Sequence, residues 1–499
     1  MKKYILTIDQ GTTSTRAILF DSKGHKVCVK QMEFNQMTPH SGWVLHNPDE
    51  IYLTVLRVIK AVINESNVNL EEIDSIGITN QRETVVVWNK ETNKPLYPAI
   101  VWQSRQSEDI CNDLIERGYT EMIHGKTGLF INPYFSASKV KWILDRYDRD
   151  HKLRDNDKLL CGTIDTYLLY RLTNGACFKT DYTNASRTLL FNINSLEWDD
   201  ELLELFGVRR SMLAEVCDSS SLFGYFNYEG VNIPITSMIG DQQSSLFGHA
   251  AFNKGNTKIT YGTGCFMLMN TKEEKIFSNK GLLTTIAYKI GDEIAYSLEG
   301  SVFVAGSAVQ WLRDGLKIIS SSSQTEEAAT LVSDSLGIYF VPAFVGMGTP
   351  YWDNESRGAI FGLSRGASKE HLIRATLEAI AYEAYDVLEV MSEEAGISID
   401  EISVDGGASS NNFLIQFESD ITQTRLTRPA ELETTALGAA YLAGLYTKFF
   451  ANIKEIEKMH EVDKLFLPTM ELEKKNELVA GWKCAVNATR MFKRKNYDL

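Results

Sequence analysis

A strand–turn–strand stretch near the N-terminus limits the possible folds most. Residues 4–21 read YILTIDQGTTSTRAILFD, and apolar and polar side chains alternate in the first strand. We expect a turn of glycine and hydroxyl residues over 11–15, with a second strand over 17–20. Such a turn can offer backbone N–H groups and hydroxyls to a phosphate, with Arg16 beside it and Asp9 placed to hold a divalent cation. The alternative is a polar hairpin tip that binds nothing.

Two known phosphate loops do not fit this stretch. No Gly-Lys-Ser/Thr follows the turn, as a P-loop requires. A strand rather than a helix comes next, which excludes a Rossmann loop.

The same strand–turn–strand design returns about 250 residues later, at residues 258–269, KITYGTGCFMLM. The two copies share a pattern and little sequence. A third glycine turn, VDGGA at 404–408, follows a strand and precedes a helical pattern over 412–423. We therefore expect a duplicated α/β domain with a ligand clamped between two lobes, divided into residues 1–249 and 250–499.

Composition narrows the possible partners and the compartment. The net charge of −14 over 499 residues repels nucleic acid and anionic membranes, so neither is an expected partner. Seven scattered cysteines contain no C-x-x-C pair, which favours a reducing compartment over a zinc site or a disulfide framework. No signal peptide and no apolar run of ~18 residues is found, so a cytoplasmic protein without membrane insertion is expected.

Three glycine/threonine turns and an acid at a strand end fit a nucleoside triphosphate. Phosphoryl transfer needs cradled phosphates, a metal and an acceptor hydroxyl near a base. Asp9 is the candidate for Mg²⁺, and Gly406 with Gly407 would let a flat base approach the backbone. Asp241, after an expected strand at 234–239, could accept the proton of the acceptor. Its alternative role is a helix N-cap.

Two further groups suggest a polyol site. Arg82 and Glu83 lie side by side at a strand end and could hydrogen-bond two hydroxyls, or form a structural ion pair. Trp102, Tyr134 and Phe266 could wall the carbon atoms of a substrate, or pack in the core as most aromatic residues do.

Motifs along essentially the whole chain resemble the FGGY family of carbohydrate kinases, and its glycerol kinases in particular. They include DQGTTSTRA, GITNQRET, NPYFSASKVKWIL, TDYTNASRT, GDQQSSLFG, YGTGCFMLMN and VDGGASSNNFLIQFESDI. NQRET followed by GDQQ separates glycerol kinases from pentulose kinases. The resemblance implies an α/β fold of two ribonuclease-H-like domains, each a mixed sheet flanked by helices, with the active site in the cleft between them. It implies transfer of phosphate from ATP with Mg²⁺ to glycerol, giving sn-glycerol 3-phosphate and ADP in glycerol uptake and catabolism, by a homodimer or homotetramer.

The resemblance also implies roles for individual residues. Glycerol would be contacted by Arg82, Glu83, Tyr134, Asp241 and Gln242, and its carbon face lined by Trp102 and Phe266. Asp241 would be the general base, and Asp9 would organise the Mg²⁺. The nucleotide phosphates would meet Thr12, Thr13, Ser14, Arg16 and Thr263. The rest of the nucleotide would be held by Gly306, Gln310, Gly407 and Asn411.

One segment departs from the regulated members of the family. Some bacterial glycerol kinases bind fructose 1,6-bisphosphate through an Arg-containing loop here, and others carry a histidine that becomes phosphorylated. Residues 223–234 read FGYFNYEGVNIP and contain neither Arg nor His. We therefore expect neither form of regulation. Two other functions stay open: a kinase of another polyol or ketose, and a non-catalytic nucleotide-dependent binding protein.

Overall fold

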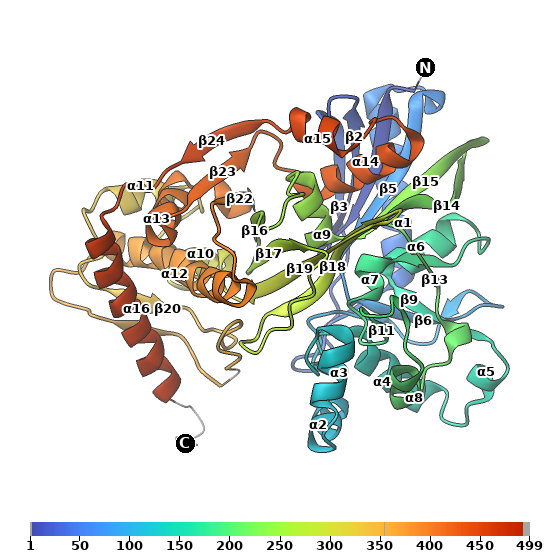
Figure 1. The fold of residues 1–499 in the computed structure, drawn as a ribbon, viewed down its shortest axis with the longest axis horizontal. Coiled ribbons are helices and arrows are strands. Elements are labelled where there is room, and N and C mark those ends of the chain that lie inside the picture. Colours follow the sequence, from blue (N-terminus) through green and yellow to red (C-terminus); the bar gives the residue numbers. More distant parts are fainter. Residues whose placement is uncertain (1, 354, 493–499) are drawn as a thin grey trace.

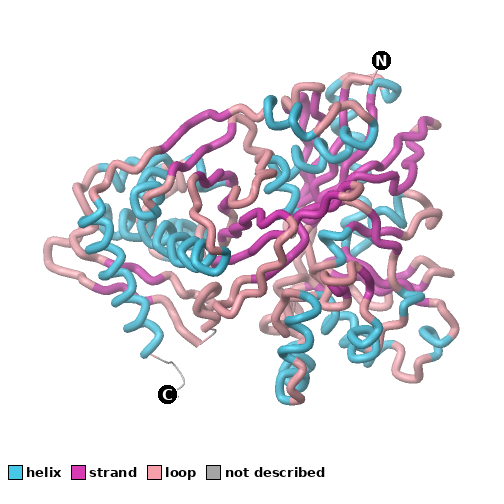
Figure 2. Tube along the Cα trace, viewed as in Figure 1, coloured by secondary structure: helices cyan, strands magenta, loops and turns pink. Residues whose placement is uncertain are grey.

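The computed structural model of the chain describes residues 2–353 and 355–492. It has two lobes, each built on a mixed β-sheet (Figure 1). The first half of the chain, blue to green, forms most of the lobe on the right, and the second half, olive to red, forms most of the lobe on the left. Helices pack around the strands of both lobes (Figure 2). The predicted α/β class with helix-flanked mixed sheets is confirmed.

The first sheet has six strands in the order β14-β15-β5-β1-β2-β3. β1, β5 and β15 run parallel in its centre, so their carboxyl ends meet at one edge of the sheet. Its strands are β1 (Tyr4–Gln10), β2 (Ser14–Asp21), β3 (Lys26–Glu33), β5 (Ile73–Asn80), β14 (Ser220–Tyr228) and β15 (Val231–Gly240).

The second sheet has seven strands in the order β18-β19-β17-β16-β22-β23-β24. It repeats the central arrangement of the first, because a hairpin, β16–β17, lies beside a parallel strand, β22. Its strands are β16 (Thr257–Tyr261), β17 (Cys265–Lys272), β18 (Leu283–Ile290), β19 (Glu293–Val302), β22 (Glu401–Gly406), β23 (Arg425–Pro429) and β24 (Val462–Phe466).

A smaller five-stranded sheet extends the first lobe and was not foreseen from the sequence. Its strands are β4 (Leu45–His46), β6 (Val85–Asn89), β7 (Lys94–Pro95), β8 (Ala99–Ile100) and β9 (Leu159–Thr163). Nearby helices add to its apolar core: α2 (Glu108–Glu116), α3 (Thr120–Thr127), α4 (Ser136–Tyr147) and α8 (Asp200–Phe206). This layer carries Trp102 and Tyr134 on its loops.

The helix limits follow the local signals in the sequence. α1 (Pro48–Ser66) begins with Pro48, and the Asn47 side chain accepts from the backbone N–H of Asp49 at 3.0 Å, a cap that contributes about 1 kcal/mol. α12 (Lys369–Ala395) ends at Gly396, which has a φ of 62°. α13 (Asn412–Thr422) matches the predicted helix. The helix predicted over 412–423 is therefore confirmed.

One helix of the second half of the sequence packs on the first sheet. α14 (Thr434–Thr447) lies against β1, β5 and β15 and against α9 (Asp241–Gly248). In Figure 1 it is orange-red and lies beside the strands of the first lobe. A Cβ on Gly438 would collide with the carbonyl of Ser244 on α9, so glycine is required there. The small residues of α14 thus allow it to pack closely on α9.

The β18–β19 hairpin of the second sheet also contacts the first lobe. Leu283 of β18 is buried in the core of the five-stranded sheet, and Thr285 hydrogen-bonds Ser186 at 3.1 Å. Two elements from the second half of the sequence, α14 and β18, therefore pack on the first lobe.

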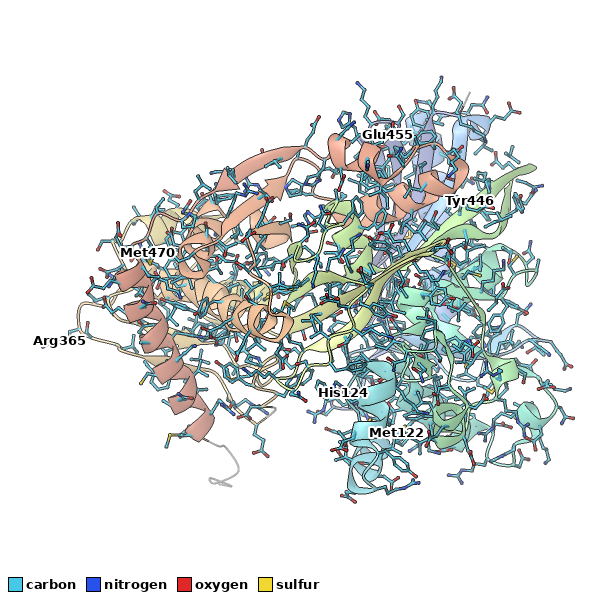
Figure 3. All side chains as sticks on the ribbon, in the orientation of Figure 1. Met122, His124, Arg365, Tyr446, Glu455 and Met470 are labelled. Atoms are coloured by element: carbon cyan, nitrogen blue, oxygen red, sulfur yellow. The ribbon has the colours of Figure 1, made fainter. Side chains whose placement is uncertain are left out.

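The chain ends in α16 (Leu472–Met491), whose Trp482 is buried and donates its indole N–H to Asp386 at 2.8 Å. Figure 3 places Met470 just before this helix, on the outer side of the second lobe. Residues 493–499 lie outside the described residues. None of the helices described combines the length and the apolar character needed to cross a bilayer.

Candidate active site

The first hairpin turns more tightly than the sequence suggested. Its ladder pairs Asp9 with Arg16 and continues one pair further, so the second strand begins at Ser14 and not at residue 17. The Gly11 N–H donates to the Ser14 carbonyl at 2.9 Å and closes the turn over Gly11–Thr13. The expectation of a five-residue turn is wrong, because hydroxyl residues fit a strand when their backbone groups join the ladder. Thr12 and Thr13 form the tip, where Thr13 is exposed and Thr12 is partly buried, and Ser14 lies buried at its base.

Asp9 is a largely buried carboxylate at the end of β1. Burial raises its pKa to about 6, with Arg16 opposing that shift and Glu433 and Asp241 adding to it. Among the described residues it makes one ion pair, with Arg16 Nη1 at 3.9 Å, whereas that guanidinium lies 2.7 Å from Glu433. Asp9 is thus a charged group with weak protein neutralisation, which suits a bound cation.

No group of three or more metal-ligating side chains occurs within the part of the chain that the structure describes. Mg²⁺ in phosphoryl-transfer sites is held by one or two carboxylates, substrate phosphates and water. Asp9, with its weakly neutralised and partly exposed carboxylate, fits that mode of binding. It does not fit a metal cage made by protein alone.

The second hairpin turns over Gly262–Gly264 and adjoins α10 (Gly306–Gln310). The Thr263 carbonyl accepts the N–H of Ala305 at 2.9 Å and of Ser307 at 3.0 Å, and the Gly306 N–H donates to Gly262 at 3.1 Å. The structure therefore brings Thr263 and Gly306 together, with Gln310 at the far end of a short helix.

The third turn leaves room beside its second glycine. β22 ends at Gly406, which has a φ of 83°, and a Cβ on Gly407 would meet nothing within 4 Å. The Asn411 side chain caps α13 by accepting from Leu414 N at 3.0 Å, and it donates to Thr325 at 3.1 Å. Gly407 thus borders open space, whereas the Asn411 amide already has protein partners.

Asp241 begins α9 directly after β15, so it lies at the edge where the parallel strands of the first sheet end. Gly240 occupies the N-cap position, so the alternative that Asp241 is the cap is wrong. Arg82 Nε lies 3.1 Å from Asp241 Oδ1. Burial raises the pKa of Asp241, and the Arg82 charge opposes that shift. The geometry provides a carboxylate beside a fixed cation.

Arg82 and Glu83 belong to a buried ring of four alternating charges. Arg82 donates to both oxygens of Glu299, at 2.6 and 2.9 Å, and Arg187 donates to Glu299 at 3.1 Å and to Glu83 at 2.6 Å. Burial would raise the pKa of Glu299, but Arg187 and Arg82 lower it to about 2. The direct Arg82–Glu83 separation is 4.0 Å, so each has a closer partner than the other. Removing one member of such a network costs about 3–5 kcal/mol.

Sequence reasoning did not assign Glu299 or Arg187 to the site. The available signals were a single acid within the apolar run AYSLEGSV and the arginine in TNASRT.

The predicted aromatic wall assembles from both lobes. Trp102 packs edge-to-face with Tyr134 at 5.5 Å and with Phe266 of β17 at 6.3 Å. The Trp102 indole N–H donates to the Thr12 hydroxyl at 2.9 Å, so the wall adjoins the first hairpin turn. Gln242 follows Asp241 on α9, and its side-chain oxygen accepts from Lys258 of β16 at 2.5 Å. Lys258 was not assigned to the site from the sequence.

Comparison with known proteins identifies the family to which the chain belongs. A model of the N-terminal domain of the FGGY family of carbohydrate kinases matches residues 4–248, and a model of its C-terminal domain matches residues 257–446. The chain belongs to the FGGY family of carbohydrate kinases.

Two relatives match this FGGY chain over nearly its whole length. Proteins named glycerol kinase from Staphylococcus epidermidis and Bacillus cereus (strain AH187) are 54% and 55% identical over 496 residues. Each match covers 99% of this chain, and 99% and 100% of the respective relative. Among solved structures, Plasmodium falciparum glycerol kinase with ADP aligns with a TM-score of 0.91 at 36% identity, covering 97% of this chain and 98% of that one. A xylulose kinase from Lactobacillus acidophilus, at 22% identity, 99% and 100% coverage and a TM-score of 0.88, shares the fold.

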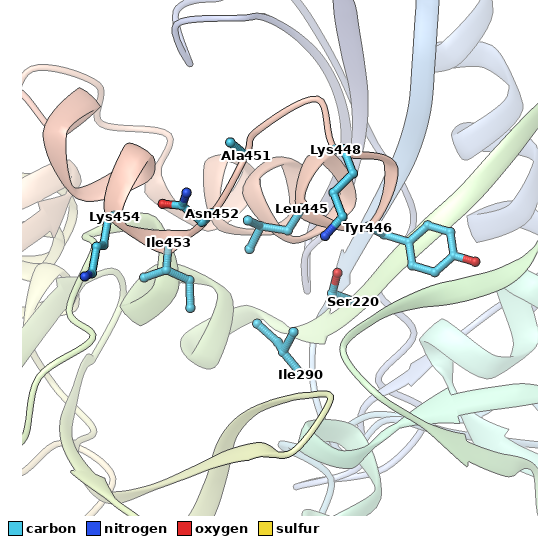
Figure 4. A pocket seen from close by; sticks show the side chains of 9 residues that line it. All are labelled: Ser220, Ile290, Leu445, Tyr446, Lys448, Ala451, Asn452, Ile453 and Lys454. Carbon is cyan, nitrogen blue, oxygen red and sulfur yellow. The ribbon is translucent and has the colours of Figure 1, made fainter.

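A cavity of about 770 Å³ in this FGGY kinase lies apart from the predicted site (Figure 4). It is lined by the end of α14 and the segment after it, with Ser220 of β14 and Ile290 of β18. None of its lining residues belongs to the predicted site. The Ser220 hydroxyl donates to the Leu442 carbonyl at 2.8 Å and ties β14 to α14 at this place.

Proposed function

We propose that the chain is an ATP-dependent glycerol kinase that forms sn-glycerol 3-phosphate. The observation that carries the proposal is Asp241, a carboxylate fixed 3.1 Å from Arg82 at the edge where the strands of the first sheet end. The full-length similarity to proteins named glycerol kinase supports glycerol as the acceptor. A relative whose structure contains ADP supports the adenine nucleotide as donor.

In this proposal the two hairpin turns hold the triphosphate from both lobes. N–H groups, hydroxyls and one guanidinium would contact the phosphates: Thr12, Thr13, Ser14, Arg16 and Thr263. The remainder of the nucleotide would lie along Gly306, Gln310, Gly407 and Asn411, where Gly407 leaves space for it. Asp9 would hold Mg²⁺ through one carboxylate and water, and the ion would supply charge neutralisation at the phosphates.

Glycerol would bind between the charge ring and the aromatic wall. Arg82 and Glu83 would hydrogen-bond two hydroxyls, Tyr134 and Gln242 would contact the polyol, and Trp102 and Phe266 would cover its carbon atoms. Asp241 would accept the proton of the terminal hydroxyl as its oxygen attacks the γ-phosphorus in line. Burial raises the pKa of Asp241, and the Arg82 charge opposes that rise and so favours the ionised form that a base requires.

The proposal also covers the domain division, the cellular location and the oligomeric state. We divide the chain into residues 1–249 and 250–499, with the polyol site on the first part and the adenosine site on the second. We place the protein in the cytoplasm, a location that its free cysteines suit. We expect a homodimer or homotetramer, which light scattering after gel filtration would measure.

An Asp241→Asn variant tests the base. We expect turnover to fall by at least about 100-fold, because the neutral amide cannot take the proton, with ATP binding and Tm retained. Asp314→Asn, at an exposed aspartate that pairs with Arg313, is the matched control and should keep full activity. Near-wild-type turnover of Asp241→Asn would refute the base assignment.

The substrate assignment has its own test. ATP consumption is measured with glycerol, dihydroxyacetone, xylulose and erythritol, and glycerol should give the highest kcat/KM. A higher value for another substrate would favour a kinase of that polyol or ketose. ATP hydrolysis that is indifferent to every acceptor would favour a nucleotide-dependent binding protein.

A further inference from the structure

Lys258 is a buried cation without a carboxylate partner. Its side chain is fully inaccessible to solvent, and within the described residues it makes no ion pair. Its ammonium donates to Gln242 Oε1 at 2.5 Å and to Thr260 Oγ1 at 2.8 Å, which are both neutral groups. Burying a charge against neutral partners is costly, and an apolar side chain of similar volume is often neutral or stabilising in such a place. Stability therefore does not explain this lysine.

The contact with Gln242 fixes the orientation of an amide at the site. An ammonium group can only donate, so the atom it contacts must be the amide oxygen. The Gln242 Nε2 group, with two donors, then has to point the other way. Gln242 follows Asp241 directly on α9, whereas Lys258 lies on β16 of the second sheet. One hydrogen bond thus links the second hairpin to the helical turn that carries Asp241.

The second contact connects Lys258, through Thr260 and Ser245, to Asp405 of the neighbouring strand β22. Thr260 Oγ1 lies 3.1 Å from Ser245 Oγ, which donates to Asp405 Oδ2 at 2.8 Å. Burial lowers the pKa of Lys258 to about 8, with Asp405 and Asp241 opposing that shift, Arg82 adding to it and Glu299 opposing it. The ammonium form therefore predominates at pH 7 and can donate to both Gln242 and Thr260.

We propose that Lys258 is a positioning residue that locks the Gln242 amide so that its Nε2 donates to the acceptor hydroxyl beside Asp241. The inference rests on the proposed function, because it assumes a polyol in this place. Without the lysine the amide can rotate and present its oxygen, which would place two acceptors, Gln242 and Asp241, side by side. Acceptor affinity would fall, whereas nucleotide binding would not.

Lys258→Met tests this proposal, since methionine fills the space without a donor. We expect the KM for glycerol to rise about ten-fold, the KM for ATP to stay within about two-fold, and Tm not to fall. Lys272→Met, at a partly exposed lysine that pairs with Glu293, is the matched control and should leave both KM values unchanged. Lys258→Gln keeps an N–H donor and should recover most of the lost glycerol affinity, and it serves also if the methionine variant fails to fold.

A double-mutant cycle shows whether the lysine acts through Gln242. The Lys258→Met/Gln242→Ala variant should have the same KM for glycerol as Gln242→Ala alone, because a fixed amide no longer exists. Additive effects, an unchanged KM for glycerol in Lys258→Met, or an equal rise in both KM values would each overturn the proposal. A wild-type enzyme that does not phosphorylate glycerol would instead refute the proposed function, so the two failures are distinguishable.

Discussion

The two hairpin turns of this kinase share a scaffold and differ in where they carry their acid. In the first lobe β1 and β2 form the hairpin and β5 runs parallel to β1, so that Asp9 on the hairpin lies opposite Thr79. In the second lobe β16 and β17 form the hairpin and β22 runs parallel to β16, so that Thr260 lies opposite Asp405. The acid and the threonine have exchanged strands.

The exchange gives the two carboxylates opposite environments. Asp405 accepts hydrogen bonds from Ser245 at 2.8 Å and from Thr434, and its Oδ2 lies 2.9 Å from Nε2 of His249. Burial would raise the pKa of Asp405, but His249, the charge of Lys258 and a hydrogen bond from Thr260 hold it below the ordinary range. Asp9 has only the distant Arg16 charge among the described residues, and its pKa is raised. One acid is stabilised by protein, and the other is left for a ligand.

The largest difference should appear on neutralising each acid. For Asp9→Asn we expect turnover to fall by at least about 100-fold, because the cation at the phosphates loses its protein ligand. Tm without nucleotide should not fall, since the change removes a poorly neutralised buried charge. Steady-state kinetics and differential scanning fluorimetry measure both. An Asp9→Asn variant that keeps its activity, or one that is strongly destabilised, would contradict the proposed difference between Asp9 and Asp405.

Asp405→Asn should show the reverse pattern. An amide cannot accept from both hydroxyls and also balance His249, so we expect a loss of about 3 kcal/mol in the free energy of unfolding. Turnover per folded molecule should fall less than in Asp9→Asn. Urea unfolding followed by tryptophan fluorescence gives the stability of each variant. Unchanged stability would mean that the hydrogen bonds around Asp405 contribute little.

The smallest effect is the pH dependence of Asp9. Its folded pKa of about 6 lies above the ordinary aspartate value, so its contribution to stability is full below the ordinary pKa and is lost as pH rises through 6. Without divalent cations, wild type should lose about 2 kcal/mol relative to Asp9→Asn between pH 4 and pH 7. The contribution of Asp405 to stability should change little between pH 4 and pH 7, because its folded pKa lies below the ordinary aspartate value. Parallel stability curves for wild type and Asp9→Asn would rule out the raised pKa.

Much of the fold was accessible from local sequence signals. The alternating residues 4–10 and the glycine/threonine turns predicted both hairpins, and the helical pattern over 412–423 predicted a helix that the structure has. The strand limit at Ser14 could not be predicted, because Thr15 and Arg16 join the ladder through their backbone. Residues far apart in the sequence also escaped prediction. Glu299 becomes part of the site only because β19 passes beneath Arg82 and Arg187, which lie more than a hundred residues earlier.

The position of α14 has a consequence for how the chain is made. β1, β5 and β15 are complete by residue 240, but the helix that covers them is synthesised about two hundred residues later. At 5–20 residues per second the ribosome needs roughly 10–40 s to reach it. During that time one face of the first sheet lacks its native cover. A chain cut at residue 249 would keep that exposed apolar face, so the first lobe should aggregate when produced alone and become soluble when the second half is co-expressed.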